Sequence, residues 1–394
     1  MKIEKRLISS LIKSSSKSVL LLGRRQTGKS TLMHSLEPEL VIDLSSESQF
    51  LEFHRNPGHL EQLIDAEKPK LVLIDEVQRI PSLLNSVQFL IDRGKRAAPR
   101  SGIPHPKFLL TGSSARKLRR GGANLLPGRI LMFELGPVVA AELTEPLQVE
   151  YAMKWGCLPE PYLTGDARIT EPLLKSYAAT YLKEEIQAEI QLRTLSGFAR
   201  FLQVAAENSG RYLDLSKFAN QAKVPRQSAV RYFEILEDTL IAYRLGPCSF
   251  TPDADLVKHP RYFFFDVGVL NGILREFSIP AERRGVLFEH VVFSQILFTA
   301  KALQQDITIE NYRTRGGVEV DFTFRWGGKV VAVECKATKD PNEADAKSLH
   351  LFSESCPSKS ELFLLSFSKR KKKFGKAMAC DLNALLEWMK NEVD

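Results

Sequence analysis

Short apolar segments alternate with helical patterns of hydrophobic residues in the first third of the chain. This alternation is typical of a parallel sheet with helices on both faces, because each strand is then buried on both sides. An amphipathic helix is expected over residues 83–91, where apolar residues recur at helical spacing. The five expected strands are Val19–Leu22, Leu40–Ile42, Leu71–Ile74, Phe108–Leu110 and Ile130–Phe133. Residues 1–146 are therefore predicted to form one α/β domain.

The middle of the chain, residues 147–278, lacks that alternation and is predicted to be mostly helical. The expected elements are helices at Leu215–Ala222 and Arg226–Thr239, a turn at Lys223–Pro225 between them, and a strand at Leu240–Leu245. Val230, Phe233, Ile235 and Leu236 are expected to face the core. This order outlines a winged helix-turn-helix, whose second helix contacts DNA. A plain helical connector accounts for the pattern equally well.

The pattern changes again over residues 279–394, which begin with a long apolar helix at Val286–Phe298. Strands are expected at Val318–Arg325, Lys329–Glu334 and Leu362–Leu365. This mixture predicts a third domain of the α+β class.

Composition is that of a folded protein and excludes collagen-like and disordered chains. Among 394 residues, 55 Lys and Arg outnumber 47 Asp and Glu, which leaves a net charge of +8 and makes nucleic acid the first partner to consider. The five cysteines are scattered without a metal-ligand spacing, as expected of reduced thiols in the cytoplasm. No apolar run approaches the roughly 18 residues that cross a membrane, so no membrane partner is expected.

A complete phosphate-binding motif follows the first expected strand. GRRQTGKS at residues 23–30 fits GxxxxGK[ST] between a strand and a helix, which is the context the motif requires. Its backbone amides are predicted to wrap the phosphates of ATP, Lys29 to reach the β and γ phosphates, and Ser30 to ligate Mg²⁺. The predicted ATP-binding residues are Gly23, Arg24, Arg25, Gln26, Thr27, Gly28, Lys29, Ser30 and Thr31.

Two further motifs are expected at the same edge of the sheet. Asp75 and Glu76 follow a buried strand, where the carboxyl ends of parallel strands form the ligand crevice. Asp75 is predicted to hold Mg²⁺ and Glu76 to orient or deprotonate the attacking water. Thr111 and Ser113, after the fourth strand, either sense the γ-phosphate or cap the next helix.

Together these motifs resemble the AAA+ ATPases of the AAA_14 type that carry a C-terminal DUF4143 region. The resemblance runs nearly end to end through GRRQTGKS, LVLIDEVQ, FLLTGSS, LPGRI, GCLPEPYL, YFFFDVG, EVDF and VECK. It implies that Thr111 or Ser113 is the sensor 1 residue and that Arg129 is an arginine finger. It also implies a ring-shaped homo-oligomer, commonly a hexamer. The alternative for Arg129 is a structural salt bridge.

The two strands of the last domain read as a hairpin with a Gly-Gly turn at 327–328. A two-residue turn pairs Trp326 with Lys329, which places Asp321 opposite Glu334 and Lys336 opposite Glu319. Two opposed carboxylates repel each other unless a cation lies between them.

Asp321, Glu334 and Lys336 resemble the PD-(D/E)XK core of restriction-endonuclease-like domains, where the acids bind Mg²⁺ and the lysine positions water. Glu289, on the preceding helix, matches a further acid of that superfamily. Three readings remain open: a catalytic nuclease, a metal or DNA site without cleavage, and a surface hairpin with a Glu319–Lys336 ion pair.

The function expected from these observations is that of a cytoplasmic, homo-oligomeric AAA+ ATPase that hydrolyses Mg-ATP and remodels DNA, including branched DNA. Arg226, Gln227 and Arg231, near the start of the second helix, are the predicted DNA contacts, although cations on a helix face often only solvate it. Two alternatives are an ATP-dependent DNA nuclease and a STAND-like nucleotide switch that controls a protein partner.

Overall fold

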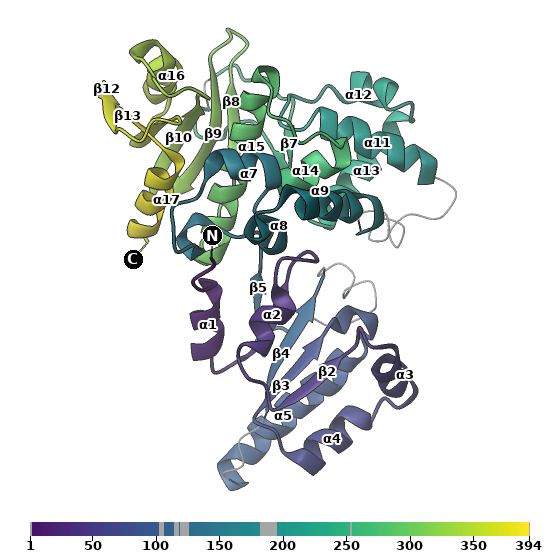
Figure 1. The fold of residues 1–394 in the computed structure, drawn as a ribbon. Helices are drawn as coiled ribbons and strands as arrows, with labels where there is room; N and C mark the ends of the chain where they lie inside the picture. Colours follow the sequence, from purple (N-terminus) through teal and green to yellow (C-terminus); the bar gives the residue numbers. More distant parts are fainter. Residues whose placement is uncertain are drawn as a thin grey trace. The chain divides into compact units, whose positions relative to one another are not determined.

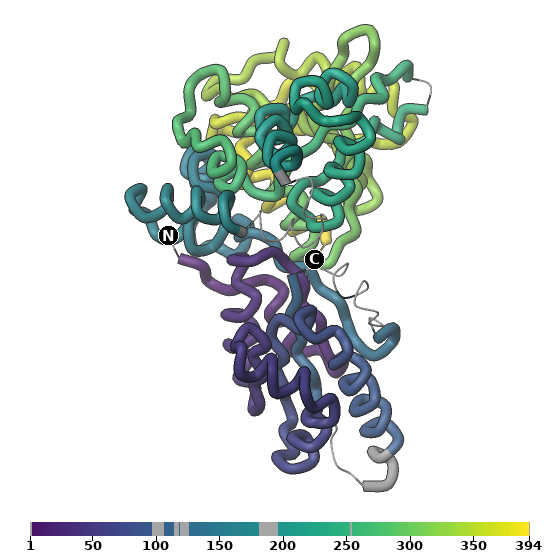
Figure 2. The backbone as a smooth tube through the Cα atoms, turned by 90° about the vertical axis from the view of Figure 1, so that its right-hand side faces the viewer, coloured from purple at the N-terminus to yellow at the C-terminus, as the bar shows by residue number. Residues whose placement is uncertain are grey.

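The computed structural model describes residues 2–101, 106–113, 118, 126–181, 195–252 and 254–393. The chain divides into two compact units, which can be followed separately by colour in Figure 2. We call Lys5–Gly136 the N-terminal unit, and Met1–Glu4 with Pro137–Asp394 the C-terminal unit. The regions expected to form a middle and a last domain thus lie within one unit.

The N-terminal unit is built on a five-stranded parallel sheet (Figure 1). Its strands are β1 (Ser18–Leu22), β2 (Leu40–Asp43), β3 (Leu71–Asp75), β4 (Lys107–Gly112) and β5 (Ile130–Glu134), in the order β2-β3-β4-β1-β5. Each expected strand lies within an observed one. Because β4 lies between β1 and β3, the residues after these three strands meet at one edge.

Helices bury both faces of this sheet, as the alternation of apolar residues predicts. The helices are α1 (Ile8–Ser14), α2 (Lys29–His34), α3 (Glu47–Arg55), α4 (His59–Glu67) and α5 (Leu83–Ser101). Leu20 and Leu22 of β1 pack with residues of α3, α4 and α5, whereas Val19 and Leu21 pack with α1 and α2. Successive residues of a strand point to opposite faces, which explains why an unbroken apolar run serves both cores.

The C-terminal unit begins with a helical part. Its elements are η2 (Ala140–Glu142), α7 (Val149–Trp155), α8 (Pro159–Thr164), α9 (Ala167–Ser176), η3 (Tyr177–Tyr181), α11 (Leu195–Glu207), α12 (Leu215–Gln221), α13 (Arg226–Asp238), α14 (Val267–Leu274) and α15 (Ala281–Ala302). Phe201, Phe218 and Phe233 join α11, α12 and α13 through close ring contacts. The two helices and the turn predicted over residues 215–239 are present.

The prediction that Val230 faces the core is wrong. Phe233, Ile235 and Leu236 are buried on α13, but the side chain of Val230 is 36% exposed. Val230 lies one position after buried Ala229, and a helix turns each residue about 100° from the last. Val230 is therefore an apolar residue on the exposed side of α13, and its apolar side chain alone did not indicate that it is buried.

A six-stranded mixed sheet forms the remainder of the C-terminal unit. It contains β8 (Glu310–Arg313), β9 (Glu319–Trp326), β10 (Lys329–Cys335), β11 (Ser360–Leu365), β12 (Lys372–Phe374) and β13 (Ala377–Cys380), in the order β12-β13-β11-β10-β9-β8. The short η5 (Glu343–Ala346), α16 (Lys347–Ser355) and α17 (Leu382–Asn391) complete it. Gly327 and Gly328 turn the β9–β10 hairpin with φ of +54° and +77°, which non-glycine residues rarely adopt. Trp326 pairs with Lys329 and Phe322 with Val333, as predicted.

The helical part and this sheet are joined by the segment between β6 (Ala242–Leu245) and β7 (Arg261–Phe264). The two strands are antiparallel, and the residues between them run beside β8. The Cys248 amide donates to the Asn311 carbonyl at 2.7 Å, and the Val257 amide donates to the Arg313 carbonyl at 2.8 Å. These bonds satisfy the edge of the six-stranded sheet and explain why the two regions form one unit.

No helix among the described residues combines the length and the apolar character that crossing a bilayer requires.

Candidate functional site

The predicted phosphate loop lies between β1 and α2 and is tightly folded. A Cβ atom on Gly23 would lie 2.4 Å from the Leu135 carbonyl oxygen, so no larger residue fits there. Gly28 caps α2 with a φ of +90°, which also requires glycine. The Lys29 side chain is 4% exposed, and its Nζ donates to the Arg24 carbonyl at 3.0 Å. The same carbonyl accepts from Thr27 Oγ1 at 2.8 Å.

Two arginines brace this loop. The Arg24 side chain is buried, and its Nη1 lies 3.6 Å from Glu134 Oε1 on β5. Arg6 donates to the carbonyls of Thr27 and Gly136 at 2.8 and 2.7 Å. The Arg24 side chain is thus buried beside Glu134. Only the main chain of Arg24 takes part in the phosphate loop. Arg6 was not predicted from the sequence.

The acidic pair lies at the same edge of the sheet. Asp75 ends β3, and the hydroxyl of Thr111, at the end of β4, donates to its carboxylate. The Glu76 amide donates to Thr111 Oγ1 at 2.9 Å, and Glu76 has a φ of +56°. Thr111 therefore holds the side chain of Asp75 and the main chain of Glu76.

Ser113 and Gln78 complete this edge. The Ser113 amide lies 3.3 Å from Gln78 Oε1, and Gln78 Nε2 donates to the Glu76 carboxylate. Gln78 is part of the LVLIDEVQ string but was not singled out from the sequence. Only the structure shows that it lies between Glu76 and the end of β4.

Arg129 contacts an acid of its own unit. Its Nε and Nη2 donate to the two carboxylate oxygens of Asp92, on α5, at 2.8 and 2.9 Å. This hydrogen bonding lowers the pKa of Asp92 and raises that of Arg129. Both side chains are about 30% exposed, with 29% for Arg129 and 32% for Asp92. The bidentate pair fixes the guanidinium in this structure.

In the C-terminal unit, Glu289, Asp321 and Glu334 gather around two cations. Arg261, the first residue of β7, donates to the Glu289 carboxylate, and its Nη1 lies 3.7 Å from Asp321 Oδ1. Arg261 Nε also donates to the Gly210 carbonyl at 2.7 Å. Lys336 Nζ lies 2.7 Å from Glu334 Oε1.

Burial and mutual repulsion dominate the electrostatics of this cluster. Burial, and then the charge of Asp321, raise the pKa of both Glu289 and Glu334 well above the ordinary range. Burial lowers the pKa of Arg261, but the Glu289 and Asp321 carboxylates outweigh it and leave that pKa above its usual value. Arg261 thus supplies a cation for Glu289 and Asp321, and Lys336 supplies one for Glu334.

The contacts of Lys336 and Glu319 differ from the sequence prediction. Lys336 follows the end of β10 and pairs with Glu334, whereas Glu319 pairs across β8 and β9 with Arg313, at 3.8 Å. The Glu319–Lys336 ion pair of the surface-hairpin alternative is therefore wrong. The prediction extended the β9–β10 ladder beyond its observed end.

The acidic cluster fits a divalent metal poorly. Within the described ranges, no group of three or more His, Cys, Asp or Glu side chains is arranged to hold a metal ion. The Arg261 guanidinium lies against Glu289 and Asp321, and Lys336 lies against Glu334, so each acid already has a cation beside it. The chemistry that this arrangement supports is internal charge neutralisation.

The predicted DNA-contacting residues lie together on α13. Arg226, Gln227 and Arg231 are all exposed, in the first two turns of the helix. Within the part of the chain that the structure describes, neither Arg226 nor Arg231 has an ion-pair partner. These cations are therefore available to an external anion.

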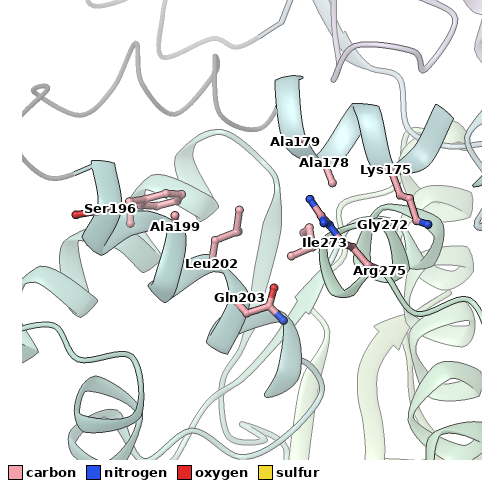
Figure 3. Close-up of a pocket in the computed structure, with 11 residues that line it drawn as sticks. Lys175, Ala178, Ala179, Ser196, Ala199, Leu202, Gln203, Gly272, Ile273 and Arg275 are labelled. Carbon is pink, nitrogen blue, oxygen red and sulfur yellow. The ribbon is translucent and has the colours of Figure 1, made fainter. Parts of the chain in front are cut away.

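A hollow of about 580 Å³ lies between α9, α11 and α14 (Figure 3). Its walls are mostly apolar, and Figure 3 shows Leu202 and Gln203 of α11 on one side and Ile273 and Arg275, at the end of α14, on the other. Lys175, at its rim, is already paired with Glu171 at 2.6 Å. We assign no ligand to this hollow.

Three family models match successive parts of the chain. The first is the AAA domain model AAA_14, which matches residues 15–144. The parallel sheet of this part of the chain fits a P-loop ATPase domain. The AAA domain thus coincides with the parallel sheet and includes the phosphate loop, the acidic pair and Arg129. Residues 147–278 match the domain of unknown function DUF8612, and residues 284–385 match the domain of unknown function DUF4143.

Two curated relatives are the uncharacterized proteins Rv2008c of Mycobacterium tuberculosis and Mb2031c of Mycobacterium bovis. Each is 25% identical over 337 residues, which cover 82% of this chain and 71% of the relative.

Solved structures give more distant likenesses. A Walker-type ATPase of Pyrococcus abyssi is 15% identical, with 68% of this chain and 95% of that chain covered and a TM-score of 0.44. A STAND protein of Pyrococcus horikoshii is 13% identical, with 77% of this chain and 47% of that chain covered and a TM-score of 0.25. AMPPCP-bound DnaA of Aquifex aeolicus is 12% identical, with 58% of this chain and 84% of that chain covered and a TM-score of 0.26. These likenesses are too distant to transfer a ligand or a partner.

Proposed function

We propose that this protein binds and hydrolyses Mg-ATP through its AAA domain. The observation that carries the proposal is that the loop after β1, with Lys29, and the ends of β3 and β4, with Asp75, Glu76 and Thr111, lie at one edge of the sheet. Lys29 supplies a cation for the β and γ phosphates, and its present acceptor, the Arg24 carbonyl, lies in the same loop. ATP turnover by the wild-type protein and by the Lys29 and Glu76 variants tests this proposal.

Ser30 and Asp75 are the residues that we propose to hold Mg²⁺. A hydroxyl oxygen and a carboxylate are ligands that Mg²⁺ prefers, so these residues fit the ion. The metal would neutralise charge on the phosphates. Glu76, next to Asp75, would orient the attacking water and accept its proton. Thr111 would hold both acids through the contacts that it already makes.

We propose further that the AAA domain works in a homo-oligomer and that Arg129 completes a neighbouring subunit's site. A guanidinium beside the γ-phosphate would stabilise the charge that develops during hydrolysis. The Asp92 pair would then have to open before Arg129 reaches a nucleotide, which is feasible because both side chains are partly exposed.

Arg129→Ala is expected to lower ATP turnover at least about tenfold while ATP affinity changes little. A small excess of this variant should depress the turnover of wild-type protein in mixtures beyond simple dilution, because each mixed interface lacks one arginine. Turnover measured across mixing ratios checks this expectation.

Asp92→Ala is the matched control, because it breaks the same ion pair but leaves the arginine. It should retain turnover if Arg129 acts on ATP. Equal losses of turnover in both variants, with linear mixing curves, would instead support a structural salt bridge.

We propose that DNA is the partner and that α13 contacts it. The support is the net charge of +8 and the exposed trio Arg226, Gln227 and Arg231 on the second helix of a winged-helix-like arrangement. In a winged helix the segment between β6 and β7 would form a free wing, but here it is hydrogen-bonded along β8. This leaves α13 as the element that would enter the DNA groove.

Replacing both Arg226 and Arg231 with Ala should weaken duplex DNA binding at least about fivefold near 0.1 M salt. It should also reduce the slope of log affinity against log salt by up to about two, since each lost phosphate contact accounts for about 0.9. Fluorescence anisotropy over a salt series measures both quantities.

The control is the double variant Arg168→Ala with Arg315→Ala, which changes the net charge equally at exposed positions away from α13. An equal loss of DNA affinity in both double variants would show a non-specific effect of net charge and would contradict a DNA site on α13.

The six-stranded sheet and Glu289 support a restriction-endonuclease-like ancestry for the last part of the chain. We infer that this part serves as a scaffold or DNA-contacting surface without cleavage, because Arg261 and Lys336 neutralise its acids. An ATP-dependent nuclease is the alternative. Strand scission in the same DNA reactions with Mn²⁺, lost in Asp321→Ala, would favour that alternative.

A further inference from the structure

Gln78 connects the acidic pair to the end of β4. It lies in η1 (Val77–Arg79), the short turn that follows Glu76. Its Oε1 faces the Ser113 amide at 3.3 Å, and its Nε2 faces the Glu76 carboxylate. The two partners determine the orientation of the amide, because a backbone N–H needs an acceptor and a carboxylate needs a donor.

The surrounding backbone leaves room for this contact. A Cβ atom on Gly112 would lie 3.1 Å from Gln78 Oε1, so a larger residue would crowd the amide. The carbonyl of Gly112 accepts from the Gly23 amide, at the start of the phosphate loop, at 3.2 Å. Gln78 therefore contacts Glu76 and β4 at the point where β4 meets the phosphate loop.

Thr111 and Gln78 have different tasks at Glu76. Thr111 holds the main-chain amide of Glu76, which does not set the direction of the side chain. Among the described contacts, the bond from Gln78 Nε2 is the one that reaches the Glu76 carboxylate. That bond engages Oε2 and leaves Oε1 to accept a proton.

We propose that Gln78 is a positioning residue that holds the Glu76 carboxylate for its work on the attacking water. This inference rests on the proposed ATPase function. In the step concerned, the water oxygen bonds to the γ-phosphorus, the bond from that phosphorus to the β–γ bridging oxygen breaks, and a proton of the water passes to Glu76. Gln78 touches neither ATP nor water in this scheme and acts through Glu76.

Two single variants separate the two bonds of the amide. Gln78→Met keeps the length of the side chain but makes neither bond, and Gln78→Glu keeps an acceptor for Ser113 but cannot donate to Glu76 when ionised. Both are expected to lower kcat at least about tenfold, while ATP affinity, measured by nucleotide titration, stays within about twofold. Wild-type kcat in Gln78→Glu would show that the Ser113 contact alone matters and would overturn the proposal.

A double-variant cycle with Glu76→Gln gives the decisive readout. If Gln78 acts through Glu76, adding Gln78→Met to Glu76→Gln should lower kcat no further. Multiplicative losses would overturn the positioning role, as would a fall in ATP affinity as large as the fall in kcat. Wild-type protein without turnover would overturn the ATPase function itself, which distinguishes the two failures. Thermal unfolding of each variant checks that it is folded.

Discussion

Lys29→Ala is expected to eliminate ATP turnover and to weaken ATP binding at least about tenfold. A charged hydrogen bond contributes about 1.5–3 kcal/mol, and Lys29 is a buried cation of the phosphate loop. Its substitution also removes the donor to the Arg24 carbonyl, so part of the effect comes from a less ordered loop. Nucleotide titration and phosphate release measure the two losses.

Lys13→Ala is the matched control for charge, since Lys13 is exposed in the last turn of α1. It should bind and turn over ATP as wild type does. ATP binding by Lys29→Ala with wild-type affinity would contradict the assignment of the phosphate site.

Glu76→Gln is expected to retain ATP binding while hydrolysis slows at least about tenfold. Glutamine has nearly the shape of glutamate, so the bond of its main-chain amide to Thr111 should survive. The neutral amide cannot accept the proton of the attacking water, which is why the chemical step should fail while binding persists. Single-turnover kinetics with excess protein separates hydrolysis from binding and product release.

Glu67→Gln, at an exposed position at the end of α4, is the control for a lost carboxylate in the same domain. Comparable turnover in Glu76→Gln and wild type would exclude Glu76 as the base.

Sequence alone predicts the AAA domain well, because its signals are local. Strands buried on both faces appear as unbroken apolar runs, and all five expected runs lie within observed strands. The phosphate loop and the Asp75–Glu76 pair are contiguous strings whose context is visible along the chain. The β9–β10 register was also predictable, since a Gly-Gly turn determines which residues face each other.

The contacts that sequence analysis missed join residues far apart in the chain. Asp92 meets Arg129, and Arg261 meets Glu289 and Asp321, through folding of whole elements onto one another. No spacing rule signals such a pair. The need for a cation beside Asp321 was apparent from the sequence, but its source, Arg261 in β7, was not. Gln78 was overlooked for another reason, since its neighbours Asp75 and Glu76 account for the motif without it.

The most direct test of this account is phosphate release from ATP by the wild-type protein, measured with Mg²⁺ and again after chelation, with Lys29→Ala as the blank. The account predicts saturable release that requires Mg²⁺ and exceeds the blank at every ATP concentration. Tight ATP binding with release no faster than in Lys29→Ala would contradict it and would point to a nucleotide-controlled switch instead.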